Sequence, residues 1–264
     1  METGNHLRLA LVQTDLFWED IPANLAALEE KIAAHETGAD VIILPEMFST
    51  GFSMEPEKLA EPLNLVTTRW MRQVALNTGA LTIGSFIARD GARFFNRLMA
   101  VAPDGQYQYY DKRHLFRMSG ENDIYTAGNE LITVEWKGWK IRPLVCYDLR
   151  FPVWSRNSGT DPYDLLIYVA NWPAARSFAW DTLLKARSIE NLSYVAGVNR
   201  VGFDNKGTGH AGGSVVLDFL GQEMLNLKGD SRIDTVDLSL QSLQDYRARF
   251  PAYLDADQFE ITNL

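Results

Sequence analysis

The segment RPLVCYDLRFP, residues 142–152, passes from an apolar run into a cluster of charged and aromatic residues. It contains Cys146, the only cysteine among the 264 residues of the chain. The apolar run is typical of a strand that is about to end, and a thiol just beyond a strand is placed as a reactive group is. Cysteine is also among the residue types most often buried as a small apolar side chain. The segment therefore leaves two alternatives for Cys146, a nucleophile or a core residue.

The composition indicates an ordinary globular protein, with 46% hydrophobic and 22% charged residues. The chain is long enough to bury a large core and shows no linker-like break, so we expect one domain over residues 1–264. A single cysteine allows no internal disulfide, and no signal peptide or membrane span is evident, which together favour the cytoplasm. The net charge of −9 argues against nucleic acid as a partner, because phosphate binding depends on clustered Lys and Arg.

Patterns typical of strands alternate with patterns typical of helices along the chain. Residues 231–264 are polar with scattered aromatic side chains, and we expect them to form a C-terminal arm after a core of about residues 5–230. The alternation predicts an α/β fold in which a mixed sheet is layered with helices. Strands are expected at residues 7–14, 40–45, 80–88, 94–102, 106–110, 131–136, 139–146, 164–170, 193–201 and 213–219, and helices at 22–36, 65–78 and 177–192, the last with Ser177 as N-cap.

Polar residues stand where several of these apolar strand patterns stop: Glu46, Lys112, Cys146 and Asn171. Ligands of α/β proteins usually bind beyond the carboxyl ends of the strands, so these side chains can share one pocket. A thiol is mostly protonated at neutral pH and needs a base or a cation to supply thiolate. Glu46 can accept that proton, and Lys112 can stabilise an oxyanion together with the backbone N–H of Tyr147.

Each of these residues also has an ordinary explanation. Glu46 can cap a turn, and Lys112 can belong to a solvated ion pair of little energetic value. His114 and His210 are the two histidines placed to serve a Cys-His dyad instead. GTGHAG, residues 207–212, matches a dinucleotide-binding pattern but leads into a strand rather than a helix, which argues against such a site. A redox role for the thiol is disfavoured because the chain has no second cysteine to resolve an oxidised one.

The segments ILPEMF around Glu46, DKRHLF around Lys112 and CYDLRFP around Cys146 resemble, in this order, the signature segments of the nitrilase superfamily of carbon-nitrogen hydrolases. The similarity extends to about residue 220 and includes WDTLLKARSIEN, residues 180–191, which resembles the family helix after the nucleophile. The resemblance implies an α-β-β-α sandwich that dimerises with a second copy, and the C-terminal arm is available for that contact.

The resemblance also implies roles for these residues. Glu46 would be the general base and later the acid, Lys112 the oxyanion donor, and Cys146 the nucleophile that carries the acyl group, with no metal and no organic cofactor. Glu121 in SGEND matches a second glutamate of the family, which would orient Lys112 and the substrate amide. The alternative for Glu121 is an exposed loop acid.

Within the superfamily, DKRHLFRMSGEN, CYDLRFPVW and VANWPAAR resemble the omega-amidase branch. That branch hydrolyses the terminal amide of 2-oxoglutaramate or 2-oxosuccinamate to the 2-oxo acid and ammonia. An arginine is the side chain best suited to bind the carboxylate at the far end of such a substrate. Arg150 is the first candidate, with Arg176 and the ring of Trp172 as pocket walls, although Arg150 can instead pair with Asp148.

Two alternatives to this function stay open at the level of sequence. One is an amidase of the same superfamily that acts on deaminated glutathione or an N-carbamoyl amine. The other is a non-catalytic family member that binds a metabolite or a partner protein in an idle pocket.

Overall fold

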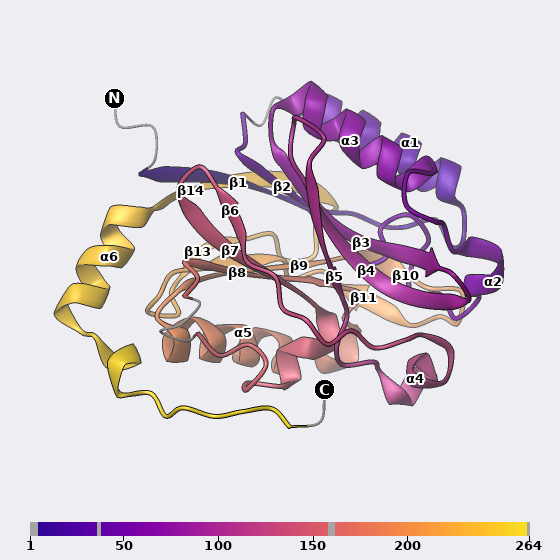
Figure 1. Cartoon of the computed structure of the whole chain (residues 1–264). Coiled ribbons are helices and arrows are strands. Elements are labelled where there is room, and N and C mark those ends of the chain that lie inside the picture. The colour runs from indigo at the N-terminus through magenta and orange to yellow at the C-terminus, as the bar shows by residue number, and fades with distance from the viewer. Residues whose placement is uncertain (1–4, 36–37, 158–161, 263–264) are drawn as a thin grey trace.

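Two six-stranded β-sheets pack face to face, and helices cover their outer faces (Figure 1). The computed structural model describes residues 5–35, 38–157 and 162–262. Helices α1 (Ile21–Ala33) and α3 (Val66–Thr78) lie on one side of the molecule, and α5 (Ser177–Asn191) lies on the other. The expected α-β-β-α sandwich is therefore confirmed.

The first sheet is built from both ends of the chain. In order across the sheet, its strands are β14 (Arg232–Ser239), β1 (His6–Gln13), β2 (Val41–Ile43), β3 (Leu81–Asp90), β4 (Arg93–Val101) and β5 (Tyr107–Asp111). The neighbours β1, β2 and β3 run parallel, and the other pairs are antiparallel. Because β2 is buried on both faces, its sequence is a continuous apolar run rather than an alternating one.

The second sheet is mixed in the same way. Its strands, in order, are β13 (Glu223–Asn226), β12 (Val215–Leu217), β9 (Tyr194–Asn199), β8 (Leu165–Ala170), β7 (Trp139–Val145) and β6 (Val134–Trp136). The central strands β7, β8 and β9 run parallel, so their carboxyl ends meet at one edge of the sandwich.

Shorter elements follow the strands and carry several pocket residues. They are α2 (Pro56–Leu59), α4 (Glu121–Ile124), α6 (Leu240–Arg249), the hairpin strands β10 (Val201–Phe203) and β11 (Gly209–Ala211), and the 3₁₀ helices η1 (Arg117–Ser119), η2 (Cys146–Arg150), η3 (Ala174–Arg176) and η4 (Ala252–Asp255).

The main core lies between the two sheets, and a second apolar cluster lies between the first sheet and its helices. Strand β1 serves both, because alternate side chains of a strand point to opposite faces. Leu9 and Leu11 belong to the core between the sheets, whereas Ala10 and Val12 belong to the cluster under α1 and α3. Burial on both sides fixes the position of this strand and of the loops that follow its neighbours.

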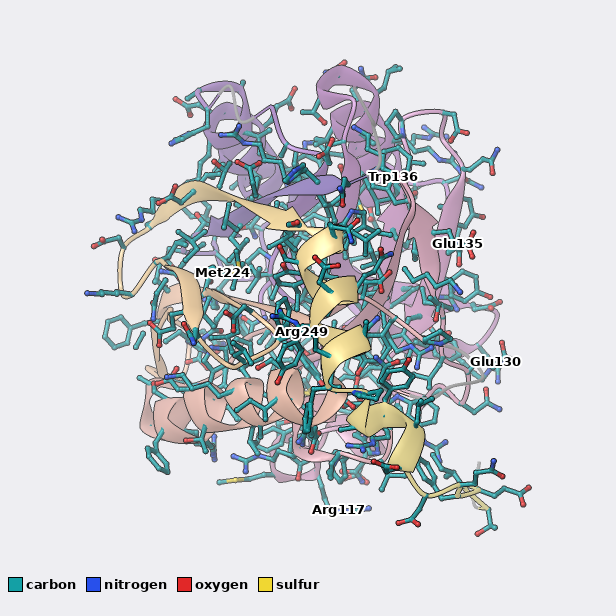
Figure 2. All side chains as sticks on the ribbon, turned by 90° about the vertical axis from the view of Figure 1, so that its left-hand side faces the viewer. Arg117, Glu130, Glu135, Trp136, Met224 and Arg249 are labelled. Atoms are coloured by element: carbon teal, nitrogen blue, oxygen red, sulfur yellow. The ribbon has the colours of Figure 1, made fainter. Side chains whose placement is uncertain are left out.

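The C-terminal arm expected over residues 231–264 begins as a strand of the first sheet. Residues 232–239 form β14, which pairs antiparallel with β1 from His6↔Ser239 to Gln13↔Arg232. Only Ile233 and Leu238 of this edge strand are buried, so its sequence is mostly polar and hides the strand. Helix α6 then packs across the edge of the sandwich (Figure 2), where Arg247 donates a hydrogen bond of 2.9 Å to Oδ1 of Asp164.

Several predicted bounds differ from the structure by a few residues, and two local predictions beside the cavity are wrong. Strand β7 ends at Val145, and Cys146 already belongs to η2, because its φ of 45° is incompatible with a strand. Ser177 is the first residue of α5 rather than its cap, and its hydroxyl donates a hydrogen bond to the carbonyl of Ala174 at 2.8 Å. No helix within the described residues has the length and apolar character needed to cross a membrane.

Candidate active site

The two sheets contribute facing side chains to one cavity of about 300 Å³. Glu46 and Lys112 follow strands β2 and β5 of the first sheet, whereas Cys146 and Asn171 follow strands β7 and β8 of the second. The predicted site residues that line the cavity are Glu46, Lys112, Cys146, Tyr147, Arg150, Trp172 and Arg176. The sandwich therefore brings together residues that lie 100 positions apart between Glu46 and Cys146 in the sequence.

Lys112 lies between two carboxylates, and all three side chains are inaccessible to solvent. Its Nζ is 2.9 Å from Oε1 of Glu46, and it is 3.0 and 2.9 Å from the two carboxylate oxygens of Glu121. Glu121 is thus the buried partner of the lysine, and the alternative of an exposed loop acid is wrong. Oε2 of Glu121 also accepts the backbone N–H of Phe116 at 2.6 Å, which ties the lysine to the cavity wall.

Burial and the neighbouring charges shift the pKa values of Lys112 and Glu121. Burial alone lowers the pKa of Lys112, but the negative charges of Glu121 and Glu46 outweigh burial and hold that pKa above its ordinary value. The lysine therefore stays an ammonium. Burial and the charge of Glu46 raise the pKa of Glu121, and the nearby Lys112 opposes this rise only in part.

Glu46 is held from both sheets. Its Oε1 accepts a hydrogen bond from Nδ2 of Asn96 at 2.8 Å, and its Oε2 accepts the backbone N–H of Asn171 at 2.8 Å. The side chain of Asn171 also donates to the backbone carbonyl of Glu46. Asn96 comes from β4 and was not predicted, although an amide inside the apolar pattern FFNRLMAVA is a signal for such a role.

Cys146 occupies a left-handed backbone conformation, with φ of 45°, at the first position of η2. Burial, reinforced by the charge and a hydrogen bond of Glu46, raises the pKa of the thiol well above its ordinary value, and Lys112 opposes this only in part. The resting thiol is therefore protonated and has a carboxylate beside it. The backbone N–H of Tyr147 lies in the first turn of η2, where helical N–H groups have no carbonyl partner within the helix.

Neither histidine is arranged as the partner of a Cys-His dyad. The Nδ1 of His114 lies 2.8 Å from Oδ1 of Asp148, and its ring stacks on Phe151 at 3.7 Å. Among the hydrogen bonds of the described residues, none joins His114 to Cys146. His210 lines the cavity, but no hydrogen bond among the described residues joins its ring to Cys146.

The wall beyond the thiol is aromatic and cationic. The guanidinium carbon of Arg150 lies 5.0 Å from the ring centroid of Trp172, and Nε1 of Trp172 donates to the carbonyl of Arg176 at 2.8 Å. The guanidinium of Arg176 in turn lies 5.4 Å from the ring of Phe116. Asp148 binds His114 instead of Arg150, so the structural pair considered for Arg150 is not formed within the described part of the chain.

Other lining residues were not assigned to a cavity from the sequence, and only His210 among them was considered, as a partner of Cys146. They include Trp18, Phe52 and Met54 from the first half of the chain, and Asp204, Lys206, Thr208 and His210 from the β10–β11 hairpin. GTGHAG forms the turn and second strand of this hairpin, which confirms that it does not open a helix. Within the described residues, no group of three His, Cys, Asp or Glu side chains is arranged to hold a metal ion.

Comparison with known proteins assigns the chain to a family. Residues 8–248 match the family model described as carbon-nitrogen hydrolase. The chain is 50% identical to omega-amidase YafV of Yersinia enterocolitica, covering 96% of this chain and 98% of that protein. It is 30% identical to 2-oxoglutaramate amidase of Bacillus subtilis, covering 94% and 96%. A crystal structure of a CN-hydrolase superfamily protein from Xanthomonas campestris, with an arsenic adduct in its active site, has a TM-score of 0.95 and 46% identity, covering 97% of this chain and 99% of that chain.

Proposed function

This chain belongs to the carbon-nitrogen hydrolase family, and we propose that it is an omega-amidase that works through a thioester on Cys146. The enzyme hydrolyses the terminal amide of a small 2-oxo dicarboxylic acid monoamide, such as 2-oxoglutaramate or 2-oxosuccinamate, and releases ammonia. One observation carries the mechanism: the thiol of Cys146 lines the same cavity as a buried carboxylate and a buried ammonium that form an ion pair.

In the first half of the reaction, Glu46 takes the thiol proton while the sulfur attacks the amide carbon. The carbonyl oxygen becomes an oxyanion, which Lys112 and the backbone N–H of Tyr147 stabilise. Glu46 then gives its proton to the amide nitrogen, the C–N bond breaks, and ammonia leaves behind a thioester on Cys146. Glu46 is suited to both transfers, because hydrogen bonds from Asn96 and Asn171 hold its carboxylate in place.

In the second half, a water molecule enters the space left by ammonia. Glu46 removes a proton from the water as it attacks the thioester carbon, and the same two donors stabilise the second oxyanion. The C–S bond then breaks, the proton returns to the sulfur of Cys146, and the 2-oxo acid departs. Glu121 contacts neither the attacking sulfur nor the amide carbon in this mechanism. It orients Lys112, whose Nζ donates to its two carboxylate oxygens at 3.0 and 2.9 Å.

The cationic wall supports the choice of a substrate with a far carboxylate. Arg150 is exposed at the cavity and its guanidinium lies over the ring of Trp172, a contact that leaves its N–H groups available for a carboxylate. Arg176 and, from the β10–β11 hairpin, Lys206 also line the cavity. In a chain with a net charge of −9, this cluster of cations attracts an anionic substrate locally.

The proposal extends to the setting in which the enzyme works. The chain acts as one domain in the cytoplasm, in keeping with a lone cysteine that remains a free thiol. It forms a homodimer, which is supported by large apolar side chains left exposed along the α5 side, notably Phe178 at 84% and Ile189 at 52%. Light scattering on the wild type and on Phe178→Glu tests the dimer, because a monomeric wild type contradicts it.

Ammonia release tests the function directly. We expect turnover of 2-oxoglutaramate and 2-oxosuccinamate, little turnover of glutamine or an aliphatic nitrile, and none by Cys146→Ala. Mass spectrometry of the wild type under turnover detects the acyl group on Cys146. Activity retained by Cys146→Ala rules out the thioester mechanism, and a folded wild type that is inactive on both 2-oxo amides rules out the substrate.

A further inference from the structure

Asp148 is a fully buried carboxylate, two residues beyond Cys146, that takes no part in the proton transfers. Its Oδ2 accepts the backbone N–H of Val145 at 3.0 Å and the hydroxyl of Tyr110 at 2.8 Å. Its Oδ1 accepts the backbone N–H of His114 at 3.0 Å and Nδ1–H of the same histidine at 2.8 Å. A buried charge is costly unless hydrogen bonds replace its hydration, and here four donors do so.

These donors come from the two halves of the site. Val145 immediately precedes the nucleophile in the second sheet, whereas Tyr110 and His114 stand on either side of Lys112 in the segment that leaves the first sheet. The carboxylate therefore joins the turn that carries the thiol to the segment that carries the ammonium. The backbone of Lys112 is fixed in addition, because its N–H donates to the carbonyl of Asn96 at 3.0 Å.

Tyr110 extends this connection. Its oxygen accepts the backbone N–H of Arg113 at 3.0 Å and Nε1–H of Trp154 at 2.9 Å, while its own proton goes to Asp148. Burial and the charge of Asp148 raise the pKa of Tyr110 well above its ordinary value, so the hydroxyl remains a donor. Three segments of the chain thus meet on one phenol oxygen and one carboxylate.

The nucleophile needs these hydrogen bonds because its backbone is strained. A residue with a side chain adopts a left-handed conformation such as the φ of 45° at Cys146 only when its surroundings impose it. On one side of Cys146, Asp148 holds the N–H of Val145; on the other, Nη2 of Arg187 donates to the carbonyl of Leu149 at 2.6 Å. The turn is thus held from within by Asp148, whose carboxylate is itself anchored by Tyr110 and His114, and from outside by Arg187.

We propose that Asp148 is a positioning residue that holds the Cys146 thiol and the Lys112 ammonium at a fixed position relative to each other. Tyr110 and His114 anchor its carboxylate. The inference rests on the proposed function only in taking Cys146 as the nucleophile and Lys112 as the oxyanion donor. It gives His114 a defined role: the histidine orients the nucleophile turn through a carboxylate and exchanges no proton with the thiol.

The test compares Asp148→Asn with the wild type by two measurements. The first is the rate constant for alkylation of Cys146 by iodoacetamide, which needs no knowledge of the substrate. The second is the division of the loss between kcat and KM for 2-oxoglutaramate. We expect kcat to fall about 100-fold, as for a displaced reacting group, with KM within about twofold and alkylation at least about tenfold slower.

Tyr110→Phe is the second variant, in case Asp148→Asn does not fold. It removes one donor to Asp148 and leaves the carboxylate in place, so we expect the same pattern with a smaller loss. Asp164→Asn is the matched control. Asp164 accepts the backbone N–H of Lys140 at 3.0 Å and Nη1–H of Arg247 at 2.9 Å, but it precedes β8 and lies at the opposite edge of the sheet from Cys146.

Folded Asp148→Asn or Tyr110→Phe with wild-type alkylation and wild-type kcat overturns the inference. So does Asp164→Asn if it loses kcat as strongly at the same loss of thermal stability, because the effect would then be one of stability alone. A wild type that releases no ammonia from any amide defeats the proposed function instead, and the alkylation rates still decide the role of Asp148.

Discussion

The backbone N–H of Asn171, at the end of β8, donates a 2.8 Å hydrogen bond to Oε2 of Glu46, which follows β2. This bond crosses from one sheet of the sandwich to the other. Since Lys112 and Asn96 occupy Oε1, both oxygens of the carboxylate are fixed by partners. The general base is therefore oriented before substrate arrives, which is the arrangement that proton transfer to and from a reacting group requires.

Replacing Glu46 by Gln removes the base and keeps the size of the side chain. We expect kcat to fall by about 10³-fold, within the range usual for loss of a general base, while the folded state persists. Ammonia release and circular dichroism measure the two effects. The histidine dyad would be favoured instead if Glu46→Gln kept its activity and His114→Ala lost all of it.

Lys112→Met leaves the buried carboxylates Glu46 and Glu121 without a counter-charge. Breaking a buried pair in this way typically costs about 3–5 kcal/mol of unfolding free energy, and the oxyanion donor is lost as well. The double variant Lys112→Met/Glu121→Gln removes one of the orphaned charges, so we expect it to be less destabilised than the sum of the single variants. Urea unfolding measures all three.

Lys58→Met is the control for this comparison. Lys58 forms a 3.2 Å pair with Glu55, but both side chains are largely exposed. Its loss is expected to change the unfolding free energy by less than about 1 kcal/mol. Equal destabilisation by Lys58→Met and Lys112→Met would mean that the buried cluster contributes no more to the unfolding free energy than an exposed ion pair.

The stability of the protein should fall steeply in alkali. Burial raises the pKa of Cys146, Tyr110 and Tyr163 well above their ordinary values. The unfolded chain releases these protons near the ordinary pKa values of about 8.5 to 10, whereas the folded chain keeps them. The folded state then binds more protons, so the unfolding free energy decreases as the pH rises through this range, by up to about 1.4 kcal/mol per pH unit for each group.

Urea unfolding at pH 8, 9.5 and 10.5 checks this slope. Tyr163→Phe removes one of the titrating groups and should make the decline shallower by about one proton. A stability that is constant or rises over this interval would contradict the prediction, because it would mean that the buried groups ionise as easily in the folded chain as in the unfolded one.

Arg150→Ala should weaken binding of acidic amides selectively. Loss of a charge-assisted contact to the far carboxylate is expected to raise KM for 2-oxoglutaramate about 10- to 100-fold, with a smaller change in kcat. Slow turnover of a neutral amide such as butyramide should not change. Arg249→Ala is the control, since Arg249 lies on α6, outside the set of cavity residues (Figure 2). An equal loss on both substrates would mean that Arg150 supports the chemistry or the fold rather than the carboxylate.

Much of the site could be predicted because its residues interrupt apolar runs. Glu46, Cys146 and Asn171 each stand directly after a buried strand or its closing proline, and a polar group at such a point is conspicuous. Lys112 follows a strand that is half polar, so its position was a weaker signal, and the resemblance of DKRHLF to the family segment supported its assignment. The folded structure adds the short contacts that bring these residues together.

The rest depends on register and on contacts between the sheets. Asn96 points toward Glu46 because of the pairing of β4 with its neighbours, and a strand buried on both faces gives no alternation from which to infer direction. The bond between His114 and Asp148 exists only because two loops from different sheets meet. Strand β14 escaped prediction because an edge strand can be polar and still complete its ladder.

The position of β14 has a consequence for how the protein is made. Strand β1 leaves the ribosome before its partner on one side, residues 232–239, which is synthesised more than 200 residues later. Until then, an apolar strand has one row of backbone N–H and C=O groups without its final partner, which is a site for pairing with other chains. Such long-range closure slows folding, so the first sheet is completed only after residues 232–239 have been translated.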